Sequence, residues 1–414
     1  MPASDTEARS LPANALPNST IVSNTATAGY GGGINENDAP VTLMRNSTVN
    51  GNTGGAGGGG LDLLDTFDNS PGALTVDNSA IVSNTAANDG GGVNNDTGST
   101  LTMTNSTIAG NTAAGFGGGI LTYSSTVALV NDTVAGNTSP NSGGGISIAN
   151  TNSLSTTLTN SILALNNAPR GPDCNGAFTS GGYNVVGSTS GGCAPSGGMG
   201  DVTNRDPRLG PLRDNGGPTL TRALLPDSPA IDLVSPASCA GLTTDQRGFP
   251  RPFPVGGACD AGAYEYQPVV TGLSPTSGPA AGGTSVIITG VDLEGATGVS
   301  FGGVAATGVV ADPSGRSVMA TSPAHAAGPV DVQAAVMAGT GVVTSTATMS
   351  GAFTYVAAPP PTRAQPSLRS VPTRRSPRRA RRSPRRARRD RQQAPTRRSR
   401  RQTPRSPRSP SSCP

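Results

Sequence analysis

The sequence predicts an all-β chain: a stack of short parallel strands, then a small β-sandwich, then a disordered basic tail. Three observations support this order. A polar repeat recurs along the first 166 residues, the 58 glycines fall largely in regular runs, and aromatic residues make up only 3% of the chain. Because a repeat protein buries layers of small aliphatic side chains instead of one globular centre, it can fold without an aromatic core.

Each repeat starts with an asparagine and has a second asparagine six residues later, and the first five repeats then reach an aliphatic residue at the end of a glycine run. The starts are Asn18, Asn46, Asn78, Asn105, Asn131 and Asn160. The second asparagines are Asn24, Asn52, Asn84, Asn111, Asn137 and Asn166. The starts are 26 to 32 residues apart while the internal offsets barely change, so each repeat is a fixed unit with an adjustable loop.

Apolar residues within a repeat alternate as they do in β-strands. Leu101 and Met103 precede Asn105 at alternate positions, and Ile108 after it has the opposite parity. A bend at the asparagine restores the inward direction, and the glycine run supplies a second corner. We expect about three short strands per coil, coils ~4.8 Å apart, and asparagine side chains that hydrogen-bond along the stack.

The glycine runs that end in an aliphatic residue, and segments such as Thr107-Ile108-Ala109-Gly110-Asn111, resemble the repeats of right-handed parallel β-helix proteins. These include the chlamydial polymorphic outer-membrane proteins. The similarity covers about residues 14–168 and implies a pectin-lyase-like solenoid over residues 1–168. Many proteins of this fold are polysaccharide lyases or hydrolases, so a carbohydrate-active enzyme is one alternative.

Four of the five cysteines fall in residues 169–267: Cys174, Cys193, Cys239 and Cys259. In a loop-rich segment they indicate two disulfides, most simply Cys174–Cys193 and Cys239–Cys259, although three pairings are possible. No pair has the Cys-x-x-Cys spacing of a zinc site.

The same segment resembles the choice-of-anchor Q region at the end of bacterial surface β-helix proteins. The matching residues are Gly182-Tyr183-Asn184, Ser228-Pro229-Ala230-Ile231-Asp232, Asp245-Gln246-Arg247-Gly248 and Cys259-Asp260-Ala261-Gly262-Ala263-Tyr264-Glu265. The resemblance implies a β-helix end region in a surface protein. Since a last coil exposes unpaired strand edges, we expect this segment to cap it, with the disulfides as staples.

Residues 268–356 contain short strand-like runs separated by Gly and Pro, which favours a small β-sandwich. Three segments carry a resemblance to IPT/TIG immunoglobulin-like domains: Ser274-Pro275-Thr276-Ser277-Gly278-Pro279, Gly282-Gly283-Thr284 and Phe353-Thr354-Tyr355-Val356. In extracellular bacterial proteins such modules act as spacers or binding units, which is what the resemblance implies here.

Residues 357–414 hold 19 Arg against one Asp, whereas residues 1–356 hold 10 Arg against 24 Asp and Glu. The tail cannot bury a core and is predicted to be disordered. At face value it would bind nucleic acid or another polyanion. The alternative is a frameshift near Ala357 that replaces a Thr/Pro-rich stalk. The chain has no apolar run long enough to span a membrane and no signal peptide at its start, so we expect an incomplete N-terminus.

The sequence offers few candidate catalytic or ligand-binding residues. Asp62, Asp65, Asp68 and Asp77 lie on or beside the longest inter-repeat loop and could bind Ca²⁺, although a solvated loop is the preferred interpretation. The Asn-x-Ser/Thr matches at Asn18, Asn46, Asn105 and Asn131 are interpreted as ladder positions, not glycosylation acceptors. The only histidine, His325, is expected at the surface of the sandwich.

Three functions remain. The first is a secreted or cell-surface structural or adhesive repeat protein, a fragment of a longer chain, that contacts an extracellular glycan or protein. The second is polyanion binding through the tail. The third is a carbohydrate-active enzyme, which is disfavoured because the repeats have one internal basic residue, Arg45, and no Lys or His. We predict the first function, with no catalytic residues and no cofactor beyond the weak Ca²⁺ candidate.

Overall fold

A computed structural model describes residues 15–37, 42–64, 72–149, 155–239, 241–338 and 343–360. The predicted tail beyond residue 360 lies outside the described residues, as do Asp65 and Asp68. Within the described ranges no helix is long and apolar enough to cross a membrane. The described part of the chain is nearly all-β, and its one short helix is the 3₁₀ turn η1 (Ser190–Gly192).

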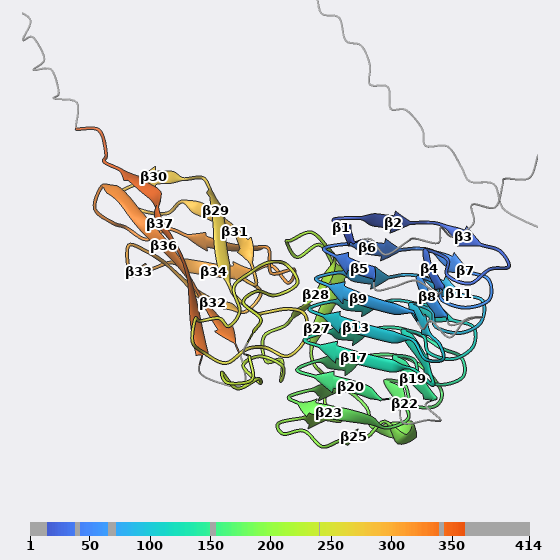
Figure 1. The fold of residues 1–414 in the computed structure, drawn as a ribbon. Helices are drawn as coiled ribbons and strands as arrows, with labels where there is room; N and C mark the ends of the chain where they lie inside the picture. The colour runs from blue at the N-terminus through green and yellow to red at the C-terminus, as the bar shows by residue number, and fades with distance from the viewer. Residues whose placement is uncertain are drawn as a thin grey trace, which may run out of the picture. The chain divides into compact units, whose positions relative to one another are not determined.

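Short parallel strands form four sheets that run along a solenoid (Figure 1). Sheet I contains β1 (Leu16–Pro17), β5 (Thr42–Arg45), β9 (Ala73–Asp77), β13 (Thr100–Thr104), β17 (Thr126–Val130), β20 (Thr156–Thr159), β23 (Phe178–Gly182) and β25 (Pro195–Ser196). Sheet II contains β2 (Thr20–Val22), β6 (Thr48–Asn50), β10 (Ala80–Val82), β14 (Thr107–Ala109), β18 (Thr133–Ala135), β21 (Ile162–Ala164), β24 (Val185–Val186) and β26 (Val202–Thr203).

Sheets III and IV complete the coils. Sheet III contains β4 (Ile34–Asn37), β8 (Leu61–Leu64), β12 (Val93–Asn95), β16 (Ile120–Tyr123), β19 (Ile146–Ala149) and β22 (Cys174–Asn175). Sheet IV contains β3 (Thr25–Ala26), β7 (Thr53–Gly54), β11 (Thr85–Ala86) and β15 (Thr112–Ala113). A coil therefore has up to four strands, one more than expected, because the two-residue segment after the second asparagine also pairs with its neighbours.

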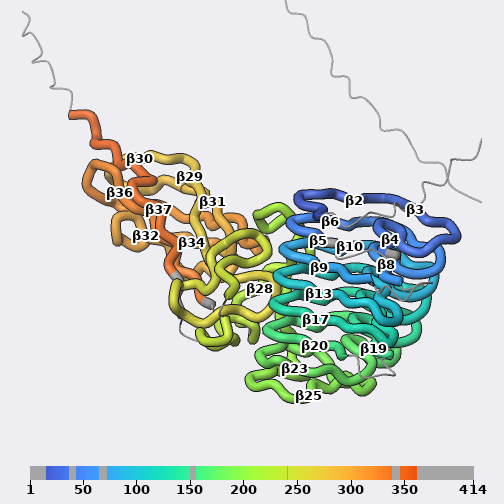
Figure 2. Tube along the Cα trace, viewed as in Figure 1, coloured from blue at the N-terminus to red at the C-terminus, as the bar shows by residue number. Residues whose placement is uncertain are grey.

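The coils stack in register, as the tube in Figure 2 shows. Leu101 pairs with Leu74 and Val127 in the coils on either side, and all three side chains are buried in one aliphatic core. The bend that alternation predicted falls at the first asparagine of each repeat. Asn105, for example, has φ +48°, a left-handed conformation that asparagine tolerates better than most residues.

The glycine runs form the second predicted corner. The glycine three residues before the aliphatic residue of each run has positive φ, as in Gly117 at +65°. The next one is required for a different reason, because a Cβ on Gly118 would lie 2.4 Å from the carbonyl oxygen of Gly144 in the following coil. The backbones of successive coils thus approach too closely for a side chain at this corner.

The parallel stack continues past residue 168, where we placed the end of the repeats. β23 pairs with β20 and β25, and β24 pairs with β21 and β26, so sheets I and II extend to Thr203. Cys174 and Cys193 lie in this extension, inside the aliphatic core of the solenoid.

Residues 204–267, here called the flanking segment, contain the antiparallel pair β27 (Leu209–Arg213) and β28 (Thr221–Leu224) and are otherwise irregular. Their contacts with the solenoid lie along the outer face of sheet II, where Leu212 and Leu220 pack on Ala80, Val82 and Ala109. Further along, Ala263 donates a 3.1 Å hydrogen bond to Thr133. The expected end cap is therefore misplaced: these contacts cover the side of several coils.

Residues 268–356 form a β-sandwich of two sheets. One contains β29 (Val269–Ser274), β31 (Ser285–Val291), β35 (Ser317–Thr321) and β34 (Thr307–Ala311). The other contains β30 (Ser277–Pro279), β37 (Val343–Val356), β36 (Gly328–Ala338), β32 (Ala296–Phe301) and β33 (Val304–Ala305). Phe301, Phe353 and Tyr355 pack edge to face in its core, with ring centroids 5.0 to 5.1 Å apart.

Candidate functional site

The second asparagine of each repeat forms a continuous hydrogen-bonded ladder inside the solenoid. Both the backbone N–H and the Nδ2 of Asn84 donate to Oδ1 of Asn111, at 2.9 and 3.0 Å. Asn111 donates in the same way to Asn137, and its Nδ2 also reaches the carbonyl of Ile81. The pattern runs from Asn24 to Asn166 and ends on Asp173, as the ladder prediction required.

A second ladder, which we did not predict, follows the residue after each starting asparagine. The backbone N–H of Ser79 donates to Oγ of Ser106 at 3.0 Å, and that of Ser106 donates to Oδ1 of Asp132 at 2.7 Å. Asp132 replaces serine in this position and is fully buried, so burial raises its pKa well above the ordinary value. The signal was visible in the sequence as Ser or Asp after every starting asparagine.

The starting asparagines themselves act mainly as corners. Asn46 and Asn160 donate long hydrogen bonds, 3.4 Å, to Asn18 and Asn131 in the preceding coils, and Asn160 also donates to the carbonyl of Ser238 in the flanking segment at 3.2 Å. Asn105 is buried and donates a 2.9 Å hydrogen bond to the carbonyl of Thr244 in the flanking segment. Burial of Asn105 and Asn131 agrees with a structural role for these Asn-x-Thr matches.

Both simplest cysteine pairs are formed. Cys174 and Cys193 join consecutive turns at the end of the solenoid, with Cα atoms 4.9 Å apart. Cys239 and Cys259 join two loops of the flanking segment, with Cα atoms 5.9 Å apart. Only the second pair staples the segment that covers sheet II. The first is part of the solenoid core.

A buried ionic cluster, which we did not assign from the sequence, lies in the flanking segment. Arg247 pairs with Asp245 at 2.8 Å, and Arg251 pairs with Glu265 at 2.9 Å. All four side chains are inaccessible to solvent. Burial raises the pKa of Glu265, and the charge of Arg251 opposes that shift. Because all four side chains are buried and paired with one another, they stabilise the fold of the flanking segment.

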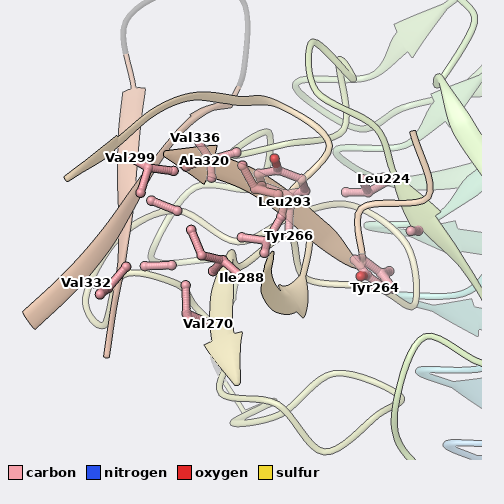
Figure 3. Packing of buried hydrophobic residues seen from close by; sticks show 14 of the residues in the cluster. Leu224, Tyr264, Tyr266, Val270, Ile288, Leu293, Val299, Ala320, Val332 and Val336 are labelled. Carbon is pink, nitrogen blue, oxygen red and sulfur yellow. The ribbon is translucent and has the colours of Figure 1, made fainter. Parts of the chain in front are cut away.

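This cluster connects three parts of the chain. Arg251 donates to Oδ1 of Asn105 in the solenoid at 3.2 Å. Tyr264 donates from its hydroxyl to Asp292 in the sandwich, and the backbone of Gln267 donates to the same carboxyl at 3.0 Å. Figure 3 shows Tyr266 of the flanking segment beside Leu293 of the sandwich, and Tyr264 belongs to the same buried cluster. Burial raises the pKa of Asp292 to about 6.

The predicted acidic site is not assembled by the residues that the structure describes. Asp62 lies on β8 of sheet III, fully buried, while Asp77 ends β9 of sheet I and pairs with Arg45 at 2.8 Å. Across the described ranges no group of three or more His, Cys, Asp or Glu could hold a metal ion. Burial raises the pKa of Asp62 to about 7, a hydrogen bond from Asn94 opposes that shift, and the charge of Asp96 adds to it. His325 is partly exposed and stacks on Tyr355.

Sheet IV ends in an open groove of about 700 Å³, lined by Thr112, Ala114, Thr138, Pro140, Asn167 and Pro169 among others. Hydroxyl and amide groups alternate here with small apolar surfaces. Phe116, next to the glycine corner of the coil that contains Thr112, is about half exposed.

Comparison with protein families gives one match, to the IPT/TIG domain, over residues 268–355. No curated protein matches the chain. The match covers the β-sandwich and leaves the solenoid and the flanking segment without a family. The chain therefore carries a C-terminal IPT/TIG domain beside a parallel β-solenoid, and this is the family relationship that its sandwich establishes.

Proposed function

We propose that this protein is a structural and adhesive component of a bacterial cell surface, in which the solenoid is a spacer and the IPT/TIG domain and the outer face of the solenoid bind. The observation that carries the proposal is the pairing of a ladder-bonded solenoid with an IPT/TIG domain through a buried cluster. Such a chain presents binding surfaces on a stiff support, with loops free to vary.

The cysteines support an oxidising compartment. Both pairs are bonded, and Cys174, Cys193 and Cys259 are fully buried. Disulfides of this kind persist in secreted and surface proteins and are rare in the cytosol. Alkylation of the protein from its native source should modify four of the five cysteines only after reduction. An antibody against residues 268–355 should label intact cells. Free thiols at all five positions, or labelling only after permeabilisation, would overturn the surface location.

The groove over sheet IV favours a glycan or an extended protein segment as partner. Thr112, Thr138 and Asn167 offer hydroxyl and amide groups to sugar hydroxyls, and Pro140 and Pro169 offer apolar contact. Beads coated with the full chain should bind saturably to one member of a glycan and matrix-protein panel. Thr138→Val with Asn167→Ala should weaken retention, whereas Thr20→Val, exposed on another face, should not. No saturable binding to any member would leave a purely structural role.

A binding role is proposed in preference to catalysis. The carboxyl groups that crowd together, Asp260 and Glu265, are buried, and each accepts hydrogen bonds from the backbone of the same segment. They are therefore placed to hold the fold. Cleavage of an acidic polysaccharide by the purified chain, lost in Asp65→Ala with Asp68→Ala, would restore the enzymatic alternative.

A further inference from the structure

One buried carboxyl group of the solenoid lacks a partner of opposite charge. Asp62 is fully buried, and its Oδ1 accepts a 2.8 Å hydrogen bond from Nδ2 of Asn94. Its Oδ2 is also buried and has no hydrogen-bond partner among the described residues. An ionised carboxylate in this position is strongly unfavourable unless a proton or a cation satisfies the second oxygen.

Two further unpartnered oxygens lie on the neighbouring strands. Parallel pairing places Asn35 of β4, Asp62 of β8 and Asn94 of β12 at the same level of sheet III. Residues in such a row share one face of the sheet and are ~4.8 Å apart from strand to strand. The Oδ1 atoms of Asn35 and Asn94 are buried and, within the described residues, accept no hydrogen bond. On the next strand the row ends at Leu121.

The surrounding charges do not neutralise Asp62. The charged side chain that acts on it is Asp96, which is itself acidic. Arg45, the basic residue inside the repeats, is on sheet I and pairs with Asp77. The row of three oxygens therefore has net negative character and no basic partner among the residues described.

The corner beside the carboxyl group is kept free of side chains. A Cβ on Gly57 would lie 3.2 Å from both Oδ1 of Asp62 and Nδ2 of Asn94. Cδ1 of Tyr30 would lie 3.5 Å from the same point. Gly57 is thus packed closely against Asp62 and Asn94, and a larger residue here would press on both side chains.

We propose that Asn35, Asp62 and Asn94 bind a Ca²⁺ ion through their side-chain oxygens, with water and backbone carbonyls completing its coordination. Carboxylate and amide oxygens are the ligands that Ca²⁺ uses, in shells of 6 to 8. A single carboxylate predicts weak binding, with a Kd on the order of 0.1–1 mM, the range of extracellular modules. This ligand set shares only Asp62 with the four aspartates proposed from the sequence, and it does not depend on adhesion.

The test is calorimetric titration of the full chain with CaCl₂ at pH 7.5, together with thermal unfolding in CaCl₂ or EDTA. At ten times Kd, Ca²⁺ should increase the folding equilibrium constant about tenfold, and Mg²⁺ should do so far less. Asp62→Asn should abolish the Ca²⁺ response. The matched control Asp77→Asn, which removes a carboxylate paired with Arg45, should retain it.

A gain of affinity keeps the test independent of whether Asp62→Asn folds. Asn35→Asp adds a second carboxylate to the row and should tighten Ca²⁺ binding about tenfold or more. The proposal is wrong if the parent chain gives neither heat nor a shift in unfolding temperature, which would assign a proton to Oδ2. It is equally wrong if binding survives Asp62→Asn but is lost in Asp65→Asn with Asp68→Asn.

Discussion

The guanidinium carbon of Arg247 lies 3.5 Å from the centroid of the Tyr264 ring, and the Tyr264 hydroxyl donates a hydrogen bond to Asp292. The same guanidinium pairs with Asp245 at 2.8 Å and comes within 4.0 Å of Asp292. One buried cation therefore serves two carboxyl groups, one in the flanking segment and one in the sandwich. Cation–π contacts are strongest when desolvated, as this one is.

Arg247→Met should destabilise the protein by about 3–5 kcal/mol, because it leaves the buried carboxyl groups of Asp245 and Asp292 without their cation. Thermal unfolding followed by circular dichroism measures the loss. Arg205→Met is the matched control, since Arg205 is exposed, and should change stability by less than about 0.5 kcal/mol. Similar small losses in both variants would show that the cluster contributes little.

Stability should fall as pH rises from about 4 to 6. Burial raises the pKa of Asp292 from 3.8 to about 6, so the folded protein holds this proton more tightly than the unfolded chain does. The unfolded chain then binds fewer protons across this window, and stability decreases with pH, on the order of 3 kcal/mol for this group. Burial raises the pKa values of Asp132, Asp260 and Glu265 too, which contributes with the same sign.

The titratable groups that interact with Asp292 are Arg247, Tyr264 and Asp245, together with Tyr266 and Glu294, so the variant must leave them unchanged. Asp292→Asn should flatten the pH dependence of the unfolding temperature between about pH 4 and 6. An unfolding temperature that climbs with pH in the parent chain, or an unchanged slope in the variant, would contradict this prediction.

Asn111→Ala should destabilise the solenoid by about 2–4 kcal/mol. The side chain accepts two hydrogen bonds from Asn84 and donates to Asn137 and to the carbonyl of Ile81, all buried. Its removal leaves several buried polar groups unpaired. Asn88→Ala, at an exposed position of the preceding coil, should have almost no effect, and unfolding of both variants in urea provides the comparison. Equal midpoints would mean that the ladder is dispensable.

Loss of either disulfide should destabilise the protein by about 3 kcal/mol from chain entropy alone, since the two loops are of nearly equal length, 19 and 20 residues. The Cys174→Ser, Cys193→Ser pair should lose more than the Cys239→Ser, Cys259→Ser pair. The serine hydroxyls at positions 174 and 193 would be buried in the solenoid core, which is unfavourable, whereas Cys239 lies at the edge of its buried cluster. Differential scanning calorimetry of both double variants tests this order, and the reverse order would refute it.

The asparagine ladder was predictable because its six-residue offset is constant and its geometry is local to one coil. The strand alternation around Leu101 and Met103 predicted the core for the same reason. The serine ladder was equally legible and was missed. The sequence indicated only weakly that the outer face of sheet II is covered. Its outward positions are polar in β6, at Thr48 and Asn50, and apolar in β10, at Ala80 and Val82. Leu212 and Leu220 pack on the apolar pair.

The buried charges could not be predicted in this way. Arg251, Glu265 and Asp292 are distant in sequence from one another or from their partners in the solenoid, and a charged residue in a Gly- and Pro-rich segment is usually solvated. Only the fold shows that Arg251 reaches Asn105 across 146 positions of sequence. Closeness in sequence also misled the prediction of an acidic site, because Asp62 and Asp77 are 15 positions apart but belong to different sheets.

The asparagine ladder also has a direction. From one asparagine side chain to the next, each rung donates to the coil that follows and accepts from the coil that precedes, and the serine ladder has the same sense. A coil can therefore be removed or duplicated only as a whole unit. If residues 105–130 were excised, Asn84 would meet Asn137 and the asparagine ladder would stay matched, whereas removal of a few residues within a strand would leave both ladders unpaired. The solenoid can thus lengthen or shorten only by whole coils. Insertions and deletions that survive selection must add or remove one complete coil, or be confined to the loops.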